Sequence, residues 1–135
     1  MAFTGNFTCN SFKSGLIDGD FDFDTDTFKI ALYTNSASLN AETAVYTTSG
    51  EVVGSGYTAG GNTLTVSKGI TGGTAFITFT DTSWSAAITA RGALIYKDSG
   101  AAVCVLDFGS DKTSTTTFSV DFPAASSTDA LIRLS

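Results

Sequence analysis

The sequence predicts an all-β protein: a single-domain β-sandwich or jelly-roll-like fold of eight to nine short antiparallel strands, with one short N-terminal helix. Segments of strand-like pattern recur at roughly 8–14-residue spacing, which is typical of sandwiches and barrels. The chain has 22 Thr and 16 Ser, and the branched Cβ of Thr favours strands. Turns come from 14 Gly and from polar clusters, whereas Pro occurs once. A length of 135 residues suits one domain over 1–135.

Residues 1–17 are predicted to form an N-terminal arm plus a short helix. Residues 3–9 alternate loosely, so this part either enters a strand or reaches out as an arm. Residues 10–17 have apolar side chains at the spacing of one helical face, namely Phe12, Leu16 and Ile17. Asn10 or Ser11 is expected to cap this helix.

Four strands are expected in the first two-thirds of the chain. Their apolar and polar residues alternate or form short apolar runs, and they span 27–34, 51–53, 62–68 and 74–80. In the first of them, Phe28, Ile30 and Leu32 share one face. Gly72-Gly73 indicates a tight reversal just before the last.

The strongest hairpin joins the strands 90–97 and 101–108 through an Asp98-Ser99-Gly100 turn. Both strands are mostly apolar, which is typical of central strands buried on both faces. Residues 110–115 are expected to be a loop. Strands at 118–122 and 131–134 complete the chain.

The acidic balance, seven basic against 13 acidic residues with a net charge of −6, argues against binding nucleic acid or an anionic membrane surface. No stretch approaches the ~20 apolar residues of a membrane helix. The first five residues lack a basic start and an apolar segment, so no secretory signal is expected. Cys9 and Cys104 are expected to be buried free thiols.

The chain contains no His, which removes the usual general base and most catalytic zinc sites. No phosphate-binding loop motif occurs. We therefore expect a protein that is not an enzyme and that needs no cofactor.

Five Asp residues alternate between 18 and 26, so that an extended segment would place them on one side: Asp18, Asp20, Asp22, Asp24 and Asp26. A Ca²⁺ ion would relieve their repulsion, but Phe23 stands where a calcium loop starting at Asp18 needs Gly. The favoured interpretation is a half-buried strand, with Phe21 and Phe23 inward and the Asp side chains facing water or neighbouring Lys. No metal site is predicted.

Exposed aromatic rings would suit a sugar-stacking platform, and the candidates are Trp84, Tyr33, Tyr46, Tyr57 and Tyr96. The alternative is that Trp84 anchors the core or a subunit contact, because buried aromatic residues dominate both. The candidate assembly contacts are Phe3, Phe7, Phe12 and Trp84. The three Phe residues either dock on a neighbouring molecule as an arm or complete the core of their own domain.

Several motifs occur in the order found in a known family: FKSGL at 12–16, FDFDTDTFKIALYT at 21–34, GSGYTAGG at 54–61, TSW at 82–84, ITARGALIYKD at 88–98 and DFGSDK at 107–112. From about residue 12 to 134 the chain resembles small structural proteins of tailed-bacteriophage virions.

The resemblance implies a capsid cement or decoration protein on the outer surface of the major capsid protein lattice. It implies self-association as a dimer or trimer, synthesis in the host cytoplasm and a final location on the virion. The alternative within the same resemblance is a tail or fibre component that binds a host surface glycan.

Overall fold

The computed structural model describes residues 3 and 5–134. Its elements are, in chain order, β1 (Phe7–Thr8), α1 (Asn10–Asp18), β2 (Phe28–Tyr33), β3 (Asn62–Leu64), β4 (Val66–Thr71), β5 (Thr74–Phe79), β6 (Thr82–Trp84), β7 (Thr89–Lys97), β8 (Ala102–Thr113), β9 (Phe118–Val120) and β10 (Ile132–Leu134). These ten strands form three antiparallel sheets, so the all-β prediction is confirmed, with one or two strands more than expected.

The largest sheet has the strand order β1-β8-β7-β2-β3. Its centre is the predicted hairpin of β7 and β8, and β2 pairs with β7 along its whole length, from Phe28 opposite Lys97 to Tyr33 opposite Gly92. The apolar runs in these strands are buried as predicted, because both faces of the sheet are covered.

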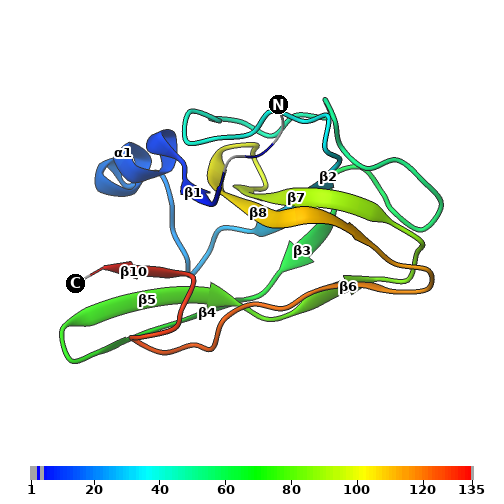
Figure 1. Ribbon diagram of the computed structural model, residues 1–135. Coiled ribbons are helices and arrows are strands. Elements are labelled where there is room, and N and C mark those ends of the chain that lie inside the picture. The colour runs from blue at the N-terminus through cyan, green and yellow to red at the C-terminus, as the bar shows by residue number, and fades with distance from the viewer. Residues whose placement is uncertain (1–2, 4, 135) are drawn as a thin grey trace.

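One face of this sheet packs on two smaller sheets, β10-β5-β4 and β6-β9, which form a second layer (Figure 1). The rings of Phe28 in β2 and Phe79 in β5 lie 6.1 Å apart across this interface. Phe108 of β8 and Phe118 of β9 are also 6.1 Å apart. The result is a sandwich-like arrangement whose core lies between the layers.

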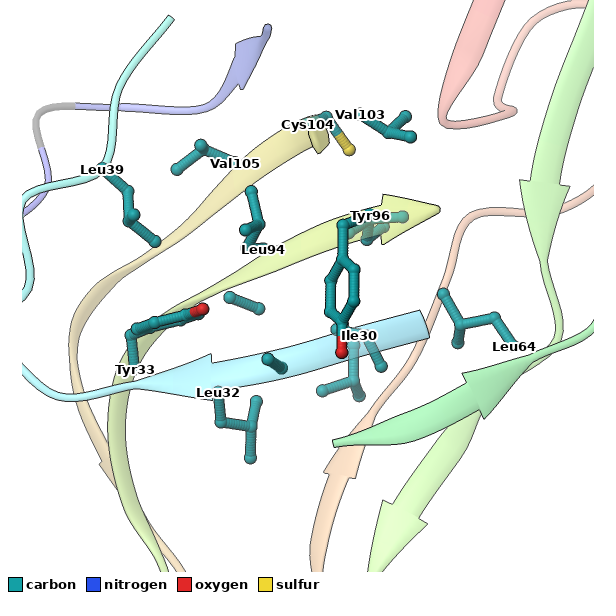
Figure 2. Close-up of a cluster of buried hydrophobic side chains, with 14 of the residues drawn as sticks. Ile30, Leu32, Tyr33, Leu39, Leu64, Leu94, Tyr96, Val103, Cys104 and Val105 are labelled. Atoms are coloured by element: carbon teal, nitrogen blue, oxygen red, sulfur yellow. The ribbon is translucent and has the colours of Figure 1, made fainter. Parts of the chain in front are cut away.

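The segment from Thr34 to Gly61 folds back on the large sheet, and its first part covers the opposite face (Figure 2), whereas Val52 bonds to β2 and Tyr57 reaches Trp84 of β6. Figure 2 shows Leu39 of this segment beside Tyr33 and Leu94, while Leu32 lies on the other side of the sheet. Leu39 is 3% exposed, so this long connection is packed as part of the core.

The helix α1 begins without the predicted side-chain cap. Cys9 occupies the cap position and offers only its backbone carbonyl, which accepts hydrogen bonds from the amides of Phe12 and Lys13. The Cys9 amide in turn donates to the Val103 carbonyl at 2.9 Å. The pairing of β1 with β8 therefore sets the start of the helix, and neither Asn10 nor Ser11 does.

Three of the expected segments differ clearly from the structure. The strand expected at 51–53 is reduced to a single bridge between Tyr33 and Glu51. The strand expected at 62–68 is divided, because β3 pairs with β2 in one layer whereas β4 pairs with β5 in the other. The loop expected at 110–115 is largely β8, which continues to Thr113 because Thr89 and Ala90 of β7 supply pairing partners.

The Gly72-Gly73 reversal between β4 and β5 is confirmed. Both residues have positive φ, 57° and 84°, which matches the twist of a two-residue hairpin and which residues with a Cβ rarely adopt.

Candidate functional site

The four candidate assembly residues are mostly buried in the fold. Phe3, Phe12 and Trp84 are at most 4% exposed, and Phe7 is partly buried against the same core. They are not brought together, since Phe3 packs on Gly92 whereas the Trp84 ring lies 5.9 Å from Tyr57. In this structure, Phe3 and Phe12 complete the core of their own domain.

The tyrosines considered for a sugar platform are turned inward. Tyr33, Tyr57 and Tyr96 are 7% exposed or less, and Tyr46 stacks on Tyr96 with ring centroids 4.6 Å apart. The Tyr33 hydroxyl donates to the Thr47 carbonyl at 2.6 Å. The exposed platform that was weighed as one interpretation is therefore not formed, because loop 34–61 folds these rings against the sheet.

The tyrosines surround a buried carboxylate, Glu51, which sequence reasoning missed. Glu51 is 6% exposed. It accepts hydrogen bonds from the Tyr46 hydroxyl at 2.5 Å, the Tyr57 hydroxyl at 2.6 Å and the Gly60 amide at 2.8 Å. Burial raises the pKa of Tyr57, and its hydrogen bond to Glu51 raises that pKa further. Both carboxylate oxygens are engaged, so this cluster anchors the loop to the sheet.

No local signal marks Glu51 in the sequence. It follows a polar stretch and precedes two valines, a pattern equally suited to a surface strand. Its partners come from both sides of it along loop 34–61, and only the fold of that loop brings them together.

The acidic segment forms a compact turn and not the predicted strand. We call residues 22–26 the Asp turn. The Asp26 amide donates to the Asp22 carbonyl at 2.9 Å, and the Asp24 amide donates to the Asp22 carboxylate at 2.8 Å. The latter bond is the main reason that the pKa of Asp22 is lowered. The extended conformation is lost because Asp side chains readily accept hydrogen bonds from nearby amides.

Two lysines form ion pairs with the Asp turn, which agrees with the prediction that the Asp side chains face water or neighbouring Lys. Lys68 of β4 pairs with Asp24 at 2.7 Å, and Lys97 of β7 pairs with Asp26 at 3.3 Å. The Phe residues of this segment point inward as predicted, with Phe23 stacked on Phe28 at 4.5 Å. Within residues 3 and 5–134, no group of three potential ligands is arranged to hold a metal ion.

A groove runs between the Asp turn and β4, and the Lys68–Asp24 ion pair divides it into two hollows. The residues lining either hollow include Phe21, Asp22, Phe23, Asp24, Asp26, Leu64, Val66, Lys68, Ile70, Ala75 and Ile77. We call this feature the β4 groove. Three carboxylates and one lysine line it, so its walls have a net negative charge.

β4 is an edge strand, since among the described residues β5 is its only neighbour in the sheet. The Thr80 amide donates to the carbonyl of Thr65, the residue opposite it in the register of β4 and β5. Because hydrogen-bonded and non-hydrogen-bonded pairs alternate in an antiparallel ladder, every second opposing pair counted from Thr65 is hydrogen-bonded. The backbone amides and carbonyls of Val66, Lys68 and Ile70 consequently point away from β5. The described part of the chain supplies no hydrogen-bond partner to these outward groups.

An exposed apolar row crosses the end of the small sheet beside this groove. Ile70 and Leu134 both pair with Ala75, so the three side chains lie on one face. It is the core-facing face, because Phe79 and Ile132 of the same face are buried. Ile70 is 71% exposed and Leu134 is 53% exposed. The small sheet thus extends beyond the layer that covers it.

Helix α1 lies at the same end of the molecule as β10 and the β4–β5 hairpin (Figure 1). Its Ile17 is 88% exposed. Three of the large exposed apolar side chains, Ile17, Ile70 and Leu134, therefore belong to elements at this end (Figure 1).

Searches against protein-family models, curated proteins and solved structures give no match. Within the described residues, no helix is long and apolar enough to cross a membrane.

Proposed function

We propose that the protein is a structural component of a tailed-bacteriophage virion, and specifically a capsid cement or decoration protein. It binds the outer surface of the major capsid protein lattice and stabilises the shell without catalysis. It self-associates as a dimer or trimer after synthesis in the host cytoplasm. The motifs between residues 12 and 112, which follow one another in the order found in such virion proteins, support this assignment.

The structural observation that carries the proposal is the surface at the end of the molecule where α1, β10 and the β4–β5 hairpin lie (Figure 1). An apolar row, an unpaired strand edge and three carboxylates lie side by side there on a firmly hydrogen-bonded scaffold. A protein that acts by adding buried area at shell junctions needs such a surface. A tail or fibre component that binds a glycan would be supported by exposed aromatic rings, whereas Trp84, Tyr33, Tyr57 and Tyr96 are buried.

Copy number in purified virions is the first test. Quantitative mass spectrometry is expected to give hundreds of copies, with antibody labelling on heads. A few dozen copies, or labelling confined to tails, would contradict the cement function and favour the alternative.

Shell stability is the second test. Particles lacking the protein are expected to release their contents at lower temperature than complete particles, and adding back the purified protein restores stability. The variant Ile70→Asp is expected to fail to restore it. Val53→Asp is the matched control, because Val53 is 94% exposed and belongs to a different element. Stripped particles as heat-resistant as complete ones would contradict the proposal.

A further inference from the structure

We propose that β4 binds its partner by strand addition: an extended segment of another protein, which presents apolar side chains and a Lys or Arg on the same face, pairs with the outer edge of β4. This inference rests on the proposed function only in assigning the partner to the virion. It names the mode of recognition and the chemistry of the segment.

The open edge supplies the backbone contacts. Six outward groups, an amide and a carbonyl from each of Val66, Lys68 and Ile70, are arranged to pair with a neighbouring strand. The residues from Lys68 to Thr71 are exposed, so a segment reaches this edge without displacing any part of the described chain.

Side chains of Val66, Lys68 and Ile70 share the core-facing face of the small sheet. An added strand therefore presents every second side chain on that face, toward the β4 groove. Apolar side chains there extend the uncovered row formed by Ile70, Ala75 and Leu134. This burial would complete the face that the chain itself leaves open.

The negative charge of the Asp turn indicates which polar side chain the partner segment carries. Asp24 and Asp26 are each paired with a lysine of the chain, whereas Asp22 has no cation within ion-pair distance among the described residues. Among the described residues Asp18 and Asp20 also lack such a partner, and they are the chain neighbours of Gly19, which lines the groove. A Lys or Arg beside this turn neutralises charge that the fold leaves unbalanced.

A second copy of the chain is a poorer occupant. Pairing β4 with β4 of another copy would place two Asp turns on the same side of a joined sheet, and their carboxylates repel. The edge thus favours a basic partner over self-association, and the proposed dimer or trimer uses another surface.

The test uses the purified chain and short capped peptides in which every second residue is Val or Lys, so that both kinds lie on one face, and the residues between them are Thr. We expect binding that weakens with added salt, together with slowed hydrogen exchange at the amides of Val66, Lys68 and Ile70. A peptide with Glu in place of each Lys is expected to bind at least about tenfold more weakly. Methylating the peptide amides along one edge keeps its charge but removes its hydrogen bonds, and is expected to abolish binding.

The matched protein variants are Ile70→Pro and Ile70→Thr. The Ile70 amide points away from β5, so proline there removes an outward donor and leaves the β4–β5 ladder intact. Thr keeps the donor. Unchanged binding by the proline variant, equal binding of the Glu peptide, or dimerisation that the proline variant abolishes would each overturn the inference.

The same variant separates this inference from the proposed function. If Ile70→Pro joins capsids as the unaltered protein does, strand addition is wrong and the cement function stands. If the chain binds Lys peptides in a proline-sensitive manner but is absent from capsids, strand addition stands and the cement function is wrong.

Discussion

Tyr57 donates a 2.6 Å hydrogen bond to the buried carboxylate of Glu51, and the same hydroxyl accepts a 2.9 Å hydrogen bond from the Leu32 amide. Leu32 belongs to β2, so the Tyr57 side chain connects the central sheet to the Glu51 carboxylate, around which loop 34–61 folds. This relationship makes the stability of the domain depend on a polar cluster inside an otherwise apolar core.

The variant Tyr57→Phe is expected to lower the free energy of unfolding by about 1–3 kcal/mol, because it leaves the buried Leu32 amide without the tyrosine hydroxyl and removes one of the two hydrogen bonds to the same Glu51 oxygen. Urea denaturation followed by fluorescence measures it. Tyr33→Phe is the control, with a smaller loss, since its hydroxyl serves only the Thr47 carbonyl. Equal losses in the two variants would show that Glu51 is not the anchor.

The tyrosines also predict alkaline unfolding. Burial, aided by the charges of Glu51 and Asp98, raises the pKa of Tyr96 from 10.0 to about 12. Burial also raises the pKa of Tyr33. The unfolded chain therefore loses these protons at lower pH than the folded chain does. Their contribution to stability is complete below pH 10.0 and falls as the pH rises toward about 12.

The measurement is the ultraviolet absorbance of tyrosinate, recorded together with circular dichroism across this pH range. We expect tyrosinate to form in one step with loss of the β signal. Gradual ionisation in a chain that stays folded would contradict the burial of these hydroxyls.

The variant Gly61→Ala is expected to cost about 2–4 kcal/mol, because it combines overpacking with a left-handed backbone. Gly61 has φ of +75°, and an added Cβ would lie 1.8 Å from the Ile30 carbonyl oxygen. Thermal unfolding checks this expectation. Gly54→Ala is the control and should be nearly neutral, because its Cβ meets no atom within 4 Å and its φ is not positive.

The variant Phe3→Ala separates the two interpretations of the N-terminal Phe residues. Phe3 is 2% exposed and packs on Gly92 of β7. Its truncation is expected to destabilise the isolated chain by about 3 kcal/mol. Val53→Ala serves as an exposed control. An arm that docks on a neighbour predicts instead an unchanged dilute monomer, so equal melting of Phe3→Ala and the unaltered chain would restore that interpretation.

Local patterns were sufficient where a segment's own residues decide its structure. The alternation in β2, the apolar runs of β7 and β8 and the turn between them predicted the centre of the fold, because strand periodicity and turn chemistry are properties of neighbouring residues. The inward direction of Phe21 and Phe23 was predicted for the same reason, although their backbone is a turn.

Tertiary structure decided what depends on distant partners. The burial of Glu51, the inward turn of the four tyrosines and the start of α1 at Cys9 follow from how loop 34–61 and β1 meet the sheet. The division of one predicted strand into β3 and β4 likewise depends on two different sheets. The sequence was enough to predict an all-β chain, but the open edge of β4 follows from the folded structure, because pairing between strands far apart in sequence is a property of the whole fold.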